Sequence, residues 1–163
     1  MIDTASLLAT RCGYAAGVTG GLGGPVVTVT NANDSGPGSL RDAVAGNAPK
    51  WVVITNAVTL HPSTPISVGS NTTIDARYGS LELIGQGFMI WAVQNVIIAN
   101  VKITKSAIDG IQLAYGVDQI WIDLPTAAGA ARAAAVRYPF RPGLARAARA
   151  QQALLSSRNS TDR

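Results

Sequence analysis

Short apolar runs recur at a constant spacing in the middle of the chain. The segments 71–75, 95–99 and 119–123 each begin with a side-chain amide and continue with mostly β-branched residues, and their starting positions are evenly spaced. A second series, Gly87–Ile90 and Gly110–Leu113, repeats one position sooner. Such runs, bounded by Gly, Asn or Ser, are typical of short strands. The constant period indicates a solenoid whose coils stack on one another.

The segments between these strands show no helical pattern, which argues against alternating strands and helices. Strands at the same position of successive coils then pair in parallel, about 4.8 Å apart. Strands of a parallel sheet have few polar side chains, and the continuous apolar runs Val52–Ile54 and Val96–Ile98 match that expectation. The sequence therefore predicts an all-β fold, a single-stranded parallel β-helix.

A column of side-chain amides is expected where one strand of each coil begins. Asn71, Asn95 and Gln119 occupy equivalent positions of the repeat. Stacked amides can hydrogen-bond to each other along the axis of the coils, which predicts a structural ladder of these three residues. The alternative is that each of them is only a turn residue. Trp121, in the same repeat, is expected to pack on or near the surface of the coil.

One short helix is expected before the coils. Ser39 is a suitable N-cap, Asp42 falls in the first turn, and the glycines at 36 and 38 prevent an earlier start. The sequence therefore predicts a helix over 39–45. A helix at this place would cover the otherwise open end of the first coil, as the ends of a solenoid require.

Composition and charge narrow the class of protein. Apolar residues make up 47% of the chain and charged residues only 13%, with 17 Gly and 8 Pro. This mixture suits short strands with many turns and does not suit a charged helical bundle. The formal net charge of +4 belongs to residues 124–163, which hold seven Arg and one acid, whereas residues 1–123 hold eight acids and six Lys or Arg.

Several further features exclude other interpretations. Cys12 is the only cysteine, so no internal disulfide can form. No run of residues is long and apolar enough to span a membrane, and the first residues lack the pattern of a secretory signal peptide. The basic C-terminal residues show no aromatic interleaving and no nucleic-acid motif, so neither a membrane nor a nucleic acid is expected as a partner.

Six segments of the chain, in order, resemble pectate lyases of the first polysaccharide lyase family. They are Gly13–Gly24 with the following Val26–Thr30, Asn33–Arg41, Val68–Asp75, Gln94–Val101, Asp109–Gln112 and Ile120–Asp123. The resemblance covers about residues 13–123. It implies the right-handed parallel β-helix of pectin lyase-like proteins, here truncated after about four coils, with a short N-terminal capping helix and a non-β tail rich in Ala and Arg.

The resemblance also implies an activity. Members of this family cleave polygalacturonate by β-elimination with Ca²⁺, so pectin is the implied partner and secretion to the cell exterior is implied as well. In this chemistry metal ions on the uronate carboxylate withdraw charge, while a base, which is an arginine in this family, removes the proton on carbon 5. Ca²⁺ binds six to eight oxygens, so several acids must converge on it.

Asp109 matches the family position that supplies a first calcium carboxylate, so it is the predicted metal residue; the alternative is a solvated turn aspartate. Asp75 and Asp123 share a column but lie two coils apart, so about 10 Å separates them and one ion cannot bridge them. The other calcium acids and the arginine base of the family come from later coils, and no residue of this chain is predicted to be catalytic. Where the family continues with a histidine, this chain has Leu124.

The composition changes abruptly after Asp123. Residues 124–163 contain twelve Ala, seven Arg and no Lys, which predicts either a disordered or loosely helical basic tail or a shifted reading frame. The predicted organisation is an unmatched segment 1–12, a partial β-helix domain over 13–123 and the tail 124–163. An uncovered last coil would expose a parallel strand edge, through which aggregation or oligomerisation is expected.

Three functions remain open. The first is a pectate lyase-like protein that is inactive as written, because it lacks the arginine base. The second is a non-catalytic β-helix that binds acidic polysaccharide. The third is a structural solenoid or gene remnant without activity.

Overall fold

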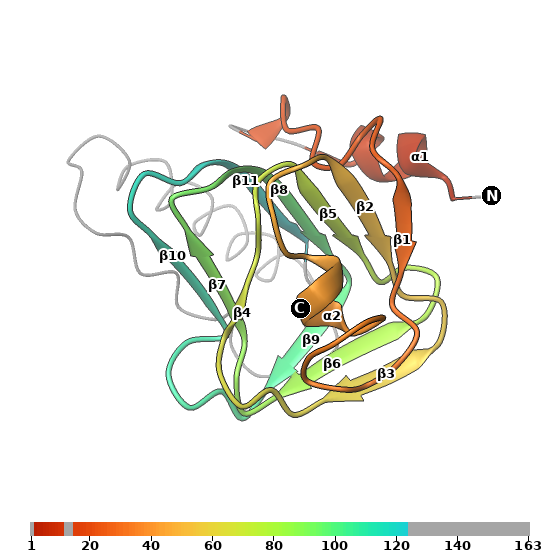
Figure 1. The fold of residues 1–163 in the computed structure, drawn as a ribbon. Helices are drawn as coiled ribbons and strands as arrows, with labels where there is room; N and C mark the ends of the chain where they lie inside the picture. Colours follow the sequence, from red (N-terminus) through yellow and green to blue (C-terminus); the bar gives the residue numbers. More distant parts are fainter. Residues whose placement is uncertain (1, 12–14, 124–163) are drawn as a thin grey trace, which may run out of the picture.

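The computed structural model describes residues 2–11 and 15–123, which Figure 1 shows as a coiled chain of short strands. The strands follow the three sides of a prism, and each side is a parallel sheet. About four coils are present, which confirms the predicted parallel β-helix. Cys12 and the tail 124–163, including Leu124, lie outside the described residues.

Three sheets form the wall of this prism. Sheet 1 has the strand order β1 (Val26–Thr28), β2 (Lys50–Val53), β5 (Thr72–Asp75), β8 (Gln94–Ala99) and β11 (Asp118–Asp123). Sheet 2 has the order β4 (Ile66–Ser67), β7 (Phe88–Trp91) and β10 (Ile111–Ala114). Sheet 3 has the order β3 (Ala57–Leu60), β6 (Ser80–Ile84) and β9 (Val101–Thr104). Each coil therefore passes from sheet 1 to sheet 3 and then to sheet 2.

The predicted repeat is the register of the strand pairs. β5 pairs Thr72 with Val96 of β8, and Val96 pairs with Ile120 of β11, which is the spacing of the first series of apolar runs. β7 pairs Phe88 with Ile111 of β10, which is the slightly shorter spacing of the second series. Residues at equivalent positions therefore stack in rows along the axis, and successive residues of a strand point alternately inward and outward.

The inward rows form the main apolar core. α2 (Leu40–Ala43) closes one end of it, because Leu40 and Val44 are fully buried there. The hydroxyl of Ser39 accepts a hydrogen bond from the backbone N–H of Asp42 at 3.2 Å, so the predicted capping helix and its N-cap are confirmed. The helix ends two residues earlier than expected. The sheets contribute aliphatic and aromatic residues, among them Val52, Ile74, Leu81, Leu83, Phe88, Ile90, Val96 and Ile98.

A second apolar cluster covers the outer face of sheet 1, and the sequence did not predict it. α1 (Thr4–Ala9) begins after Asp3, whose side chain accepts from the backbone N–H of Ser6 at 2.9 Å, and Figure 1 shows it beside sheet 1. Trp121 packs in this cluster, near the coil surface as expected. No helix within the described ranges is long and apolar enough to cross a membrane. The cluster consists of Leu7, Val18, Trp51, Val53, Ile97, Ala99 and Trp121.

The loop before α2 is anchored by an ion pair at the surface. Arg41 donates to Asp34 Oδ1 at 2.7 Å and to the carbonyls of Thr64 and Pro65 at 2.9 and 3.0 Å. The hydroxyl of Ser63 donates to the other oxygen of Asp34 at 2.5 Å. These hydrogen bonds, from Ser63 first and Arg41 second, lower the pKa of Asp34 from 3.8 to about 2.

We expect the protein to lose stability as the pH falls from 3.8 towards about 2, because Asp34 must then bind a proton that its folded surroundings disfavour. A lowered folded pKa stabilises the protein above the unfolded pKa, so this contribution is complete near neutral pH. The Asp34 side chain is 34% exposed, so solvent screening limits the effect to about 1 kcal/mol. Urea unfolding of Asp34→Asn and the parent chain between about pH 2 and pH 6 measures it. A stability difference that does not shrink in acid would contradict this assignment.

Candidate functional site

Asp109 lies in the turn that carries the chain from sheet 3 to sheet 2. It follows β9 and precedes β10, and it is half-buried. Tight stacking of two coils holds this turn in place. The carbonyl of Gly110 accepts the backbone N–H of Phe88 at 2.9 Å, and a Cβ on Gly87 would lie 1.7 Å from the Gly110 oxygen. Only glycine fits at position 87, and this contact positions the residue that follows Asp109.

The described residues supply one predicted calcium ligand and do not complete a calcium site. Within 2–11 and 15–123, no three or more His, Cys, Asp or Glu side chains are grouped to hold a metal ion. A single carboxylate offers at most two of the six to eight oxygens that Ca²⁺ takes. An ion at Asp109 would therefore need oxygens from a bound uronate or from residues outside this part of the chain.

Asp75 and Asp123 lie on a different side of the prism from Asp109. Both belong to sheet 1, where Asp75 pairs with Ala99 and Ala99 pairs with Asp123. Two strand spacings therefore separate the two acids, as expected. Asp75 is also fully buried and forms an ion pair with Arg77 at 2.8 Å. It is thus a structural residue of sheet 1.

Asn71, Asn95 and Gln119 stand near the start of β5, β8 and β11. All three have a left-handed backbone, with φ of 54°, 60° and 54°, a conformation that asparagine tolerates better than most residues. Asn95 Nδ2 donates to Asn71 Oδ1 at 3.0 Å, and Asn71 Nδ2 donates to the carbonyl of Asn47 at 3.1 Å. Gln119 takes the next position in this row. Asn71 and Asn95 are thus in direct contact, while a stabilising role for the row stays a prediction.

Asn95 also ties the N-terminal segment to the coils. Its Oδ1 accepts the backbone N–H groups of Thr19 and Gly20 at 2.9 and 2.8 Å, and its Nδ2 donates to the carbonyl of Gly20 at 3.1 Å. Gly20 has φ of 55°, and an added Cβ would lie 2.1 Å from Thr73 Oγ1. Sequence analysis missed this contact because the partners lie 75 and 76 residues apart. The glycine-rich run 20–24 is its only local sign.

The arginines of the described residues, Arg11, Arg41 and Arg77, all have other partners. Arg11 Nε donates to a carbonyl of α1 at 2.7 Å, Arg41 pairs with Asp34 and Arg77 pairs with Asp75. The hydrogen bond to Asp75 raises the pKa of the Arg77 guanidinium above its ordinary value. A general base must lose its proton near the working pH, so this shift opposes such a role.

Sheet 3 carries a charge pair near its outer surface. Lys102 Nζ lies 3.1 Å from Glu82 Oε1, and the hydroxyl of Thr104 donates to the same oxygen at 3.0 Å. These contacts, Lys102 first, lower the pKa of Glu82. An acidic polysaccharide would therefore meet a lysine whose charge is already balanced by a carboxylate.

The fold defines the class of protein, a parallel β-helix with tightly stacked turns. A solved structure with this architecture is the crystal structure of Jun a 1, the major allergen from cedar pollen. The two chains superpose with a TM-score of 0.65 and 23% sequence identity, over 72% of this chain and 42% of the allergen. At this identity the likeness shows the fold alone.

Sequence comparison identifies the family. Pectate lyase 2 of Ambrosia artemisiifolia is 34% identical over 136 residues, which cover 68% of this chain and 34% of that protein. Pectate lyase plyB of Emericella nidulans is 36% identical over 115 residues, which cover 69% and 32%. No family model matches the chain. This chain is related to the N-terminal part of the pectate lyases, and it spans about a third of the length of the curated relatives it matches.

Proposed function

We propose that this β-helix is a pectate lyase-like unit that binds polygalacturonate with the help of Ca²⁺ outside the cell, and that the polypeptide of this sequence does not cleave it. The observation that carries the proposal is the likeness of two thirds of the chain to proteins named pectate lyases. The parallel β-helix fold supports it independently, because its stacked turns place Asp109 at the junction of two sheets.

Support for binding without cleavage comes from the inventory of bases. β-Elimination takes the proton from carbon 5 of the uronate and breaks the bond between carbon 4 and the glycosidic oxygen, which leaves a double bond between carbons 4 and 5. The step needs a base beside carbon 5. The described arginines have other partners, and the raised pKa of Arg77 works against proton transfer. We therefore assign no residue of this part of the chain to a catalytic step.

Asp109 is the residue that we assign to calcium. Its carboxylate is a hard oxygen ligand of the type that Ca²⁺ prefers. Polygalacturonate carries a carboxylate on each sugar unit, so this polysaccharide and Asp109 would repel each other without a cation between them. A bound Ca²⁺ would supply that positive charge and take oxygens from both partners. The proposal therefore implies binding that requires Ca²⁺.

We expect Asp109→Asn to weaken the Ca²⁺-dependent retention of the protein in gels containing polygalacturonate by about tenfold or more, because a charged ligand oxygen is lost. Asp118→Asn is the matched control, since it removes an exposed carboxylate from β11 and should leave retention unchanged. A chelator should release the parent chain and the control alike. In parallel, ultraviolet absorbance should detect no unsaturated uronates.

Two results would overturn parts of this proposal. Robust, chelator-sensitive formation of unsaturated uronates would show that the polypeptide contains a base. The absence of any retention in polygalacturonate, with or without Ca²⁺, would favour a structural solenoid instead.

A further inference from the structure

Trp91 and Tyr115 form an exposed aromatic pair at one end of sheet 2. Their side chains are 52% and 60% exposed, and their ring centroids lie 4.2 Å apart with the planes tilted by 35°. Trp91 is the last residue of β7 and Tyr115 follows β10, so the rings belong to neighbouring coils. Ala114, the register partner of Trp91, carries only a methyl group and leaves the indole uncovered.

The backbone at Tyr115 has an unusual conformation. Its φ is 50°, and Ala92, at the same place in the preceding coil, has φ of 52°. A bulky residue in this region is uncommon, and residues held there cluster at ligand sites more often than elsewhere. Glycine would adopt the same φ at no steric cost. The aromatic ring is therefore present at this turn despite the preference of the backbone.

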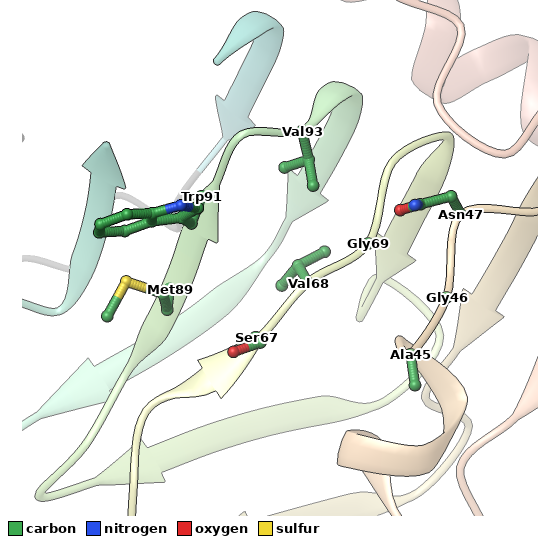
Figure 2. Close-up of a pocket in the computed structure, with 9 residues that line it drawn as sticks. All are labelled: Ala45, Gly46, Asn47, Ser67, Val68, Gly69, Met89, Trp91 and Val93. Carbon is green, nitrogen blue, oxygen red and sulfur yellow. The ribbon is translucent and has the colours of Figure 1, made fainter. Parts of the chain in front are cut away.

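A hollow of about 590 Å³ adjoins this pair. Figure 2 shows Trp91 on one side of it and the amide of Asn47 on the other. The backbone of Gly46 and Gly69 forms part of its wall, because a Cβ on Gly69 would lie 1.8 Å from the Gly46 oxygen. Met89 and Val93 add apolar surface. The surface thus combines an aromatic face with a group that can hydrogen-bond, as saccharide and other small-molecule sites do.

The hollow carries no charge. None of the described residues that line it is Asp, Glu, Lys, Arg or His. The ammonium of Lys50 is directed to the backbone carbonyls of Ala45 and Gly46, and Lys50 is only 8% exposed. An anionic ligand would lose hydration here without meeting an exposed opposite charge, whereas an uncharged ligand avoids that cost.

We propose that Trp91, Tyr115 and the adjoining hollow bind a pyranose polysaccharide whose units are uncharged, with methyl-esterified galacturonan as the representative ligand. The C–H face of a pyranose ring is flat and apolar and complements an aromatic ring, while its edge hydroxyls suit the amide of Asn47. Rings on neighbouring coils allow contacts to successive sugar units. Asp109 does not line the hollow, and the inference rests on the proposed function only for the choice of a galacturonan backbone.

The intrinsic fluorescence of tryptophan tests this site directly. The chain has three tryptophans, and Trp51 and Trp121 are only 1% and 6% exposed, so Trp91 dominates quenching by iodide. With a chelator present, methyl-esterified oligogalacturonate should protect the protein from iodide and shift its emission to shorter wavelength. Unesterified oligogalacturonate of the same length should do so at least about tenfold more weakly. Tyr115→Ala should weaken the binding of the esterified ligand by about tenfold while keeping the fluorescent reporter.

Control variants separate this site from the proposed calcium site. Val26→Ala, which trims an exposed apolar residue on sheet 1, and Asp109→Asn should both leave the fluorescence response unchanged. Conversely, Tyr115→Ala should leave the Ca²⁺-dependent retention by polygalacturonate intact, so each proposal can fail without the other. Equal affinity for both oligosaccharides, or no protection by either, would overturn the inference. A spectral shift that grows with protein concentration without sugar would overturn it too, since a second copy of the chain would then cover the rings.

Discussion

Asp75→Ala is expected to lower the free energy of unfolding by about 3 kcal/mol. The carboxylate is fully buried on the outer side of sheet 1, where it accepts from Arg77 Nε and Nη2 at 2.9 and 2.8 Å and from Trp51 Nε1 at 3.2 Å. Its loss leaves a guanidinium and an indole N–H without their acceptor next to an apolar cluster. Because the Arg77 side chain is 26% exposed, we take the lower end of the range for broken buried pairs. Urea or thermal unfolding of the two chains measures the difference.

The same substitution should also loosen the N-terminal segment. Arg77 Nη2 donates to the carbonyl of Asp3 at 2.9 Å, and the hydroxyl of Tyr78 accepts the backbone N–H of Asp3 at 2.6 Å. Amide hydrogen exchange in α1 should therefore become faster in Asp75→Ala. Asp34→Ala is the matched control, because it removes an Arg–Asp pair at the surface and should cost only about 1 kcal/mol. Equal losses of stability in the two variants would contradict a buried, anchoring role for Asp75.

The coils could be predicted because their register is written in the sequence as a period. Thr72, Val96 and Ile120 follow one another at the spacing that pairs them in sheet 1. Each coil buries the same positions, so the same types of residue recur, and the pattern survives even where individual residues differ. The helix over 39–45 could be predicted for a similar reason, since its N-cap and the glycines before it are local signals. Its exact end depends on packing against the core and could not.

The covering of sheet 1 could not be predicted from local patterns. α1 has six residues, of which Leu7 is the buried one, so it has no apolar stripe that identifies its partner. Its contacts are to strands far along the chain. Trp51 and Trp121 did indicate that the outer face is apolar, and a parallel sheet buried on both faces needs a second layer over it. The identity of that layer emerges only from the tertiary contacts.

The candidate site shows the same division. Asp109 could be singled out because a short motif surrounds it, and the stacking of Gly87 on Gly110 explains why a turn is formed there. The aromatic pair of Trp91 and Tyr115 had no motif and no repeat. The two rings meet because β7 and β10 are neighbours in sheet 2, and register alone brings them together.

Asn95→Ala is expected to destabilise the protein by about 3 kcal/mol, through two separable effects. The side-chain amide makes hydrogen bonds to Asn71, Thr19 and Gly20, and these partners lose them together, at about 1 kcal/mol each for the better-buried ones. Alanine must also adopt the φ of 60° that asparagine tolerates, which costs about 1 kcal/mol more. Denaturant unfolding measures the total. Faster hydrogen exchange at Thr19 and Gly20 would locate the loss at the joint between the N-terminal segment and the coils.

Asn95→Gly separates the two effects, because glycine adopts a positive φ freely and lacks the amide. It should therefore retain about 1 kcal/mol of the stability that Asn95→Ala loses, even though glycine has the more flexible unfolded chain. Asn33→Ala, at an exposed position of the loop before α2, is the control and should change stability by less than about 0.5 kcal/mol. If alanine and glycine at position 95 were equally destabilising, the backbone contribution would be absent. If both matched the control, the amide row would contribute no stability, and the stacked coils would depend on their apolar rows and backbone ladders alone.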